Sequence, residues 1–199
     1  MKKYKLIIII AIGSSIFLVT AWKLQQLSKT KIALKNEIMK TTDVAQSSLE
    51  TMIKLSKEKS VFTKNFLNSN PKNLSLIKND LLILENSTLK TQAEFSQWEN
   101  SLSKVNNLVA EYLIQELKIS KNNSNTKNVN SIDNLVKVIE HQDQEIDSTI
   151  KNYAILRNKR NQLIENWKQI PFSKNEAFLT LPNSPLYEQM LQRPTILQK

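Results

Sequence analysis

A chain of 199 residues with no cysteine and a single glycine, Gly13, excludes disulfides, thiol chemistry, glycine-rich phosphate loops and the tight hairpins of an all-β fold. It is 40% hydrophobic, which is enough for a core. Residues 1–40 hold eight lysines and one glutamate and carry most of the net charge of +10, whereas a nucleic-acid-binding protein would carry it on the folded domain, so we expect no nucleic-acid partner.

The first predicted element is an apolar segment with lysines on both sides. Residues 6–22 are uncharged and mostly apolar, and they follow a basic flank at residues 1–5. The segment is bordered by Tyr4, Lys5, Trp22 and Lys23, the aromatic and basic residues that are typical of a membrane interface with anionic lipid headgroups. A helix of this length nearly spans a hydrocarbon core of about 30 Å. We therefore predict a single-pass transmembrane helix in the cell (inner) membrane.

Two questions about this segment stay open. A secretory signal peptide cleaved after Val19–Thr20–Ala21 would share its basic start and apolar middle, although helical periodicity continues past Ala21. The lysines on both sides also leave the side of the membrane occupied by the large domain undecided.

Three long helices are predicted for the rest of the chain, over residues 24–67, 71–119 and 129–170. In each, apolar residues recur at alternating spacings of three and four, which places them on one stripe of a helix. Polar stretches separate the helices, and Asn70 and Pro71 are suitable as the N-cap and first residue of the second. We expect an all-α fold, in which residues 23–170 form an elongated, coiled-coil-like antiparallel three-helix bundle. A homo-oligomeric parallel coiled coil is the competing arrangement.

The middle helix has the most regular stripe of the three. Its stripe continues through Asn86-Ser87-Thr88, which matches the acceptor pattern for N-glycosylation. Because the pattern falls inside a predicted helix, we expect no glycan there.

The candidate interaction residues lie on the third predicted helix. They either bind a partner or form a polar part of the packing stripe, and they are Asp143, Tyr153, Arg157, Arg160 and Asn161. A charge that is buried in such a stripe needs a partner. In an antiparallel bundle, the acids nearest the two arginines would be on the early second helix: Asp80, Glu85 or Glu94. We prefer the other interpretation, in which both arginines extend outward to solvent.

Residues 171–199 form a proline-containing tail that cannot be one long helix. Its apolar residues, including Phe172, Phe178, Leu186 and Tyr187, are more numerous than an inert linker requires. The tail is therefore either a strap that folds back on the bundle or a docking segment for a protein partner.

Catalytic and metal-binding patterns are not found in this sequence. His141 is the single histidine, and it stands near Glu140 and Asp143 without a second histidine or any cysteine, so we interpret it as part of a solvated helix face. We expect a protein that is not an enzyme and that has no cofactor.

The last predicted long helix carries a recognisable series of residues: Ile146, Tyr153, Asn161, Ile164 and Trp167. In this series the helix resembles the last long helix of the LemA family of bacterial membrane proteins. Ala154 stands where the family has its first asparagine, and Arg160 where it has its second tyrosine. The resemblance implies a membrane-anchored helical bundle without known catalysis.

We therefore expect a scaffold or interaction protein of the bacterial cell envelope. The alternative is a sensor, in which a ligand binds between the helices and a membrane partner receives the signal.

Overall fold

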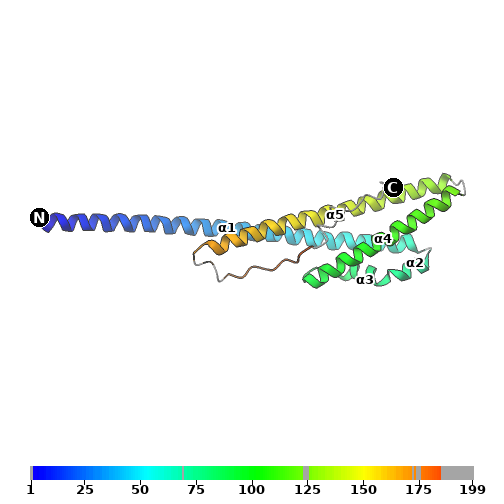
Figure 1. Cartoon of the computed structure of the whole chain (residues 1–199), viewed down its shortest axis with the longest axis horizontal. Coiled ribbons are helices and arrows are strands. Elements are labelled where there is room, and N and C mark those ends of the chain that lie inside the picture. The colour runs from blue at the N-terminus through cyan, green and yellow to red at the C-terminus, as the bar shows by residue number, and fades with distance from the viewer. Residues whose placement is uncertain (1, 69, 123–125, 172, 174–175, 185–199) are drawn as a thin grey trace. The chain divides into compact units, whose positions relative to one another are not determined.

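The computed structural model describes residues 2–68, 70–122, 126–171, 173 and 176–184, without the side chains of residues 2–16, 120–122 and 126–130. Within these ranges the chain forms α-helices and no strand, which confirms the predicted all-α class. In chain order, the helices are α1 (Lys2–Leu67), α2 (Pro71–Leu76), α3 (Lys78–Asn86), α4 (Gln92–Asn122) and α5 (Thr126–Gln169), as shown in Figure 1.

The chain divides into two compact units. Unit 1 comprises Met1–Asp43 and Asn158–Phe178, and unit 2 comprises Val44–Arg157 and Leu179–Lys199. Helices α1 and α5 each contribute residues to both units, so each unit is described separately below.

The predicted second helix, residues 71–119, is wrong, because the structure has three helices in this range. Residues 87–91 form the sharpest break, so the Asn86-Ser87-Thr88 pattern lies at the end of α3 and not inside a helix. Leu89 adopts a left-handed φ of 54°, and its side chain is fully buried. Burying a leucine side chain contributes about 1.5–3 kcal/mol. That gain is comparable with or larger than the cost of a left-handed residue, about 1–2 kcal/mol.

Thr91 and Glu94 fix the start of α4. The backbone amide of Glu94 donates to Thr91 Oγ1 (3.1 Å), and Glu94 Oε2 accepts from Thr88 Oγ1 (2.7 Å) and from the amide of Lys90 (3.0 Å). These hydrogen bonds keep the pKa of Glu94 below its ordinary value, first through the Thr88 hydroxyl. Thr-x-x-Glu is the sequence pattern of a helix N-terminus, and the regular apolar stripe concealed it here.

In the described part of unit 2, four helical segments run alternately up and down: α1 from residue 44 onward, the α2–α3 pair, α4 and α5 (Figure 1). The prediction of a three-helix bundle therefore gave one helical segment fewer than unit 2 contains. Trp98, Phe95 and Tyr153 form the aromatic centre of the core, with the Phe95 ring 5.7 Å from that of Trp98 and stacked 5.6 Å from that of Tyr153. Trp98 Nε1 donates to Ser56 Oγ on α1 (2.8 Å), which satisfies the indole donor in the core.

A buried ion pair joins α1 to α5 in unit 2. The Lys59 ammonium, 2% exposed, donates to the carboxylate of Asp143, which is 21% exposed. Asp143 was predicted to need a partner if it faced the core, and Lys59 on α1 provides it. Because a lysine in an apolar stripe is costly without an acid opposite, this pair fixes how α1 and α5 align.

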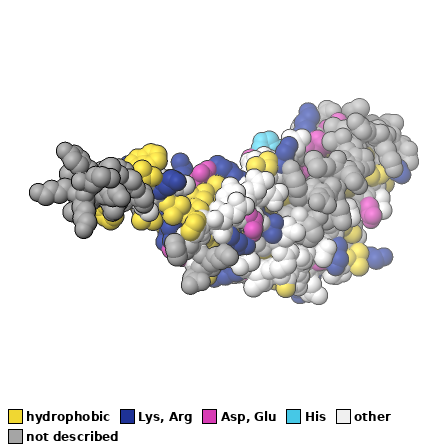
Figure 2. Space-filling model, turned by 60° about the vertical axis from the view of Figure 1, so that its left-hand side comes forward, with side chains coloured by type: hydrophobic (Ala, Val, Ile, Leu, Met, Phe, Trp, Pro, Cys, Tyr) yellow, Lys and Arg dark blue, Asp and Glu magenta, His cyan; other side chains and the backbone are white. Residues whose placement is uncertain are grey.

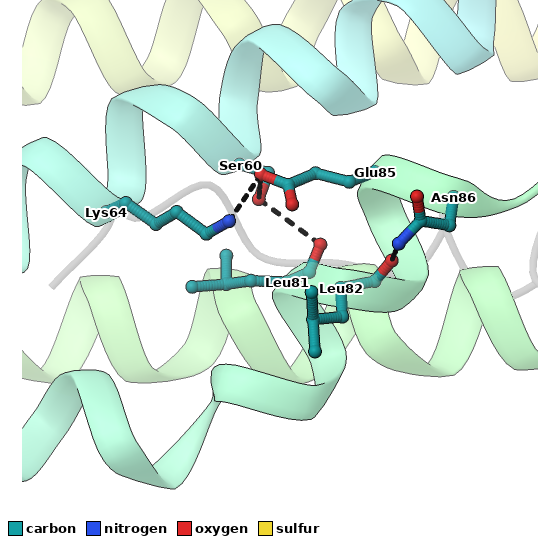
Figure 3. Close-up of polar contacts among 6 residues, drawn as sticks. All are labelled: Ser60, Lys64, Leu81, Leu82, Glu85 and Asn86. Carbon is teal, nitrogen blue, oxygen red and sulfur yellow. Dashed lines mark hydrogen bonds and ion pairs between the residues drawn. The ribbon is translucent and has the colours of Figure 1, made fainter.

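A second polar cluster joins α1 to α3, as Figure 3 shows. Ser60 Oγ lies 3.2 Å from Leu81 O and 3.1 Å from Glu85 Oε1, and Lys64 Nζ donates to the same carboxylate oxygen (2.5 Å). The Lys64 ammonium, helped by the Ser60 hydroxyl, holds the pKa of Glu85 below its ordinary value. At the end of α3, Asn86 Nδ2 donates to Leu82 O (2.9 Å).

Unit 1 pairs the early part of α1 with the end of α5. Arg160 Nε donates to Thr42 Oγ1 (2.7 Å), and the Lys31 ammonium lies 5.2 Å from the centre of the Trp167 ring. Trp167 Nε1 donates to Ser173 O (2.9 Å), so the chain that follows α5 turns back against its last turn.

No helix within the described part of the chain is long and apolar enough to cross a membrane. The predicted transmembrane segment, residues 6–22, falls mostly on side chains outside the description, and so do Tyr4 and Lys5. Trp22 and Lys23 are described, and both are exposed.

Replacing Lys59 with methionine tests the buried ion pair. The Asp143 carboxylate would lose its partner, and losing one member of a buried pair costs about 3–5 kcal/mol. Because Asp143 keeps some solvent contact, we expect the free energy of unfolding to fall by about 3 kcal/mol, at the lower end of that range. Urea denaturation measures this change. Lys54→Met is the matched control on α1, because Lys54 pairs with Glu58 at 3.9 Å on an exposed surface. It should change the free energy by less than about 0.5 kcal/mol. Equal losses in the two variants would contradict the role of the pair.

Glu85→Gln tests the α1–α3 cluster through pH. A carboxylate with a lowered folded-state pKa stabilises the fold above its unfolded pKa, and that stability is lost as the pH falls through the folded value. The ordinary pKa is 4.5, so the wild type should lose free energy of unfolding below that pH more steeply than the variant does. Urea titrations at several pH values from about 6 to about 3 measure the slope. Glu111→Gln, at an exposed position on α4, should leave the slope unchanged, and equal slopes in wild type and Glu85→Gln would contradict the assignment.

Candidate functional site

Residues Leu179–Ser184, which we call the strap, lie against α4 and α5 within unit 2. The residues that contact them define the strap site: Gln92 and Glu99 on α4, and Tyr153 and Arg157 on α5. Gln92 and Glu99 are seven residues apart, and Tyr153 and Arg157 are four apart, so each pair lies on one face of its helix. Two neighbouring helix faces thus form one surface for an extended segment.

The strap site binds the main chain of the strap with side chains. Gln92 Nε2 donates to Asn183 O (2.9 Å), and Gln92 Oε1 accepts from the amide of Asn183 (2.5 Å). The Tyr153 hydroxyl donates to Pro182 O (2.7 Å), and Arg157 Nε donates to Leu181 O (3.3 Å). Residues 176–184 form neither helix nor strand, so these side chains satisfy backbone groups that secondary structure would otherwise satisfy.

The deepest contact joins Ser184 to Glu99. Glu99 is 1% exposed, and its Oε1 accepts from Ser184 Oγ (2.5 Å), which is also buried. Leu181, also buried, joins the same hydrophobic core as Tyr153. The strap is therefore bound through the buried side chains of Leu181 and Pro182, one hydroxyl and several main-chain groups.

The predicted interaction residues fall at separate places. Tyr153 and Arg157 lie in the strap site, Asp143 pairs with Lys59, Arg160 is buried in unit 1, and Asn161 is exposed. Within unit 2, the structure brings Tyr153 and Arg157 together at the strap site and places Asp143 in the separate pair with Lys59.

The preferred interpretation of the two arginines, that both extend outward, is wrong. Arg160 is buried against Thr42, and Arg157 is half-buried at the strap. The acids proposed as their partners contact other groups: Asp80 accepts from Ser101 (2.9 Å), Glu85 from Lys64, and Glu94 from its own turn. The expected geometry assumed one long second helix, and the break at residues 87–91 moves those acids.

Of the predicted docking residues in the tail, the structure describes one, Phe178. Phe178 is half-buried, with its ring edge-on to Trp167 at 5.7 Å in unit 1. Phe172, Leu186 and Tyr187 lie outside the described residues. In the described part, the tail lies against helices as a strap does.

Gln92 and Ser184 were missed by sequence reasoning. Neither belongs to a motif, and their roles depend on a tertiary approach between segments far apart in the chain. The sequence did contain an indication for Lys59. Ser56, Lys59 and Thr63 follow one another at spacings of three and four, as residues on one packing stripe do, and all three are buried.

No group of three His, Asp or Glu side chains among the described residues is placed to hold a metal ion. His141 is exposed, with Nδ1 3.6 Å from Glu145 Oε2. It borders an open hollow of about 380 Å³ between α1 and α5, lined also by Thr51 and Ser148.

Comparisons with protein-family models, with curated proteins and with solved structures found no match.

Gln92→Ala tests how the strap is held. Losing both hydrogen bonds to Asn183 should speed amide exchange at Asn183 about tenfold, the ratio that corresponds to roughly 1.4 kcal/mol. Hydrogen exchange followed by mass spectrometry measures it. Gln97→Ala, at another exposed glutamine of α4, should leave exchange at Asn183 unchanged, and a similar rise in both variants would show that α4 itself is disturbed.

Proposed function

We propose that this chain is a non-enzymatic scaffold or interaction protein of the bacterial cell envelope, similar to the LemA family and anchored in the cell (inner) membrane by residues 6–22. Helical unit 2 would present its surface to a protein partner, and residues 185–199, with Leu186 and Tyr187, would supply further docking residues. Lipid headgroups would contact Lys23 and the lysines that follow it.

The exposure of the helix at residues 17–24 carries the membrane part of this proposal. Its apolar residues are exposed as follows: Phe17 72%, Leu18 67%, Val19 54%, Trp22 60% and Leu24 59%. At 100° per residue these positions spread over about 220° of the helix circumference, which is wider than a single packing stripe. Figure 2 shows hydrophobic side chains gathered beside the grey atoms at the left, with lysine and arginine next to them. An apolar surface wider than one stripe suits lipid or a protein core, and here it continues the apolar segment of residues 6–16, which is also flanked by lysines.

The use of the buried charges supports a scaffold. Catalytic groups are often buried ionisable side chains with shifted pKa values. In unit 2 the buried charged side chains join one structural element to another: Lys59 to Asp143, Asp80 to Ser101, and Glu99 to Ser184. These contacts hold helices and strap in place.

Membrane fractionation of the full chain tests the proposal. Wild-type protein should stay in the membrane pellet through a high-salt wash, and Ile12→Arg with Ile16→Arg should release it, because each arginine near the centre of residues 6–22 costs about 2.5–3.5 kcal/mol on insertion scales. Val61→Arg with Leu76→Arg, at exposed apolar positions of unit 2, is the matched control and should stay in the pellet.

A crosslinking residue at position 187 in the same membranes reports the partner. The proposal expects a specific adduct with an envelope protein in wild-type membranes. Release of the wild type by salt would overturn the anchor, and detection of residues 1–5 in the mature protein distinguishes an anchor from a cleaved signal.

A further inference from the structure

We propose that the strap site also binds the strap of a second copy of this chain, so that two copies exchange Leu179–Ser184 and form a dimer. This inference rests on the proposed role as an interaction protein and names one partner: another molecule of the same chain. It concerns unit 2 alone, where both the strap and its site lie.

The strap makes the same contacts whether it binds the site of its own chain or the site of a second copy. The hydrogen bonds described above join the strap to side chains of α4 and α5, and the same side chains can bind a strap that comes from either chain. Exchange of an identical element therefore changes little in contact energy, which makes it a low-cost route to a dimer. The balance between one chain and two is then set by concentration.

The strap is suited to exchange because of how it is held. Residues 176–184 have no helix or strand to unwind, and Gln92 and Asn183 are both exposed at its edge. Releasing the strap breaks a small number of hydrogen bonds and exposes Leu181.

When the strap leaves its site, side chains of the site lose hydrogen bonds that another strap can restore. Without Ser184, the buried Glu99 side chain loses the hydrogen bond that it accepts from the strap. The Tyr153 hydroxyl likewise loses its acceptor at Pro182. A strap from a neighbouring copy matches both, as well as the pocket for Leu181, because its sequence is the same.

The proposed membrane anchor would favour the exchanged form. Copies confined to one membrane meet at an effective concentration far above that of dilute solution. Because the single chain and the exchanged dimer have the same strap contacts, a higher concentration favours the dimer.

Cysteine crosslinking on the full chain tests exchange, because the natural chain has no cysteine. Ser96 lies on α4 between Gln92 and Glu99, and its hydroxyl accepts a long hydrogen bond from Gln92 Nε2 (3.4 Å) that a cysteine sulfur can also accept weakly. Asn183 contacts the site through its main chain, so a cysteine at that position keeps its contacts with Gln92. One chain carries Ser96→Cys, and a second chain with a different tag carries Asn183→Cys. They are co-expressed and treated with a short bismaleimide.

Exchange predicts a covalent heterodimer that contains both tags. A single chain with both cysteines should give an intramolecular link, which confirms that the reagent spans the site. Adding Leu181→Asp to the Asn183→Cys chain should abolish the heterodimer, because a carboxylate at that position cannot enter the core. An intramolecular link without any heterodimer would overturn the proposal.

Thr51→Cys and Ser148→Cys form the matched control pair. Both are exposed hydroxyl residues that line one hollow between α1 and α5 of unit 2, away from the strap. Mixed chains with this pair should give at least about tenfold less heterodimer than the strap pair, since the strap takes no part. Equal yields would mean random collision or exchange of whole helices, and would also overturn the proposal.

The two proposals fail separately. Absence of a heterodimer leaves the membrane fractionation result untouched, and release of the wild type from membranes leaves the crosslinking result in solution intact.

Discussion

Tyr153 is the side chain on which the arrangement of unit 2 depends most. Its ring is fully buried and stacks on Phe95 of α4, while its hydroxyl reaches Pro182 O. A tyrosine combines a large apolar ring with one polar end, so a single residue can pack in the core and still bind a polar segment at its edge. The core of the bundle and the strap are therefore held by the same side chain.

The remaining buried polar contacts determine how the helices align. Apolar stripes with spacings of three and four allow neighbouring helices to slide by whole turns with little loss of packing. Lys59 opposite Asp143, and Ser60 with Lys64 opposite Glu85, favour one alignment, because any shift would leave a buried or half-buried charge without its partner. These contacts add specificity more than stability.

The helical periodicity was sufficient to predict an all-α chain, the long first helix and the limits of the last one. The periodicity did not reveal that the predicted second helix is interrupted at residues 87–91, because Thr88 and Thr91 keep the spacing of the stripe. In the structure, Thr91 and Glu94 mark the start of a new helix, α4. Tyr153 and Arg157 stood out in the sequence as polar residues in an apolar stripe. Their contacts with the strap did not, because these depend on a segment that approaches from elsewhere in the chain and is recognised mainly through its backbone.

Recognition through the backbone has a consequence for partners. Gln92, Tyr153 and Arg157 bind carbonyl and amide groups that every extended peptide has. Selectivity therefore rests on the buried side chains of the strap: Leu181, Pro182 and Ser184. Glu99 makes the serine requirement strict, because a residue without a donor at that position would leave a buried carboxylate oxygen without this hydrogen bond. The sequence that satisfies these requirements in this structure is the chain's own strap. A surface built in this way discriminates by a few buried side chains and binds by the main chain, and the proposed exchange with a second copy would use the same contacts.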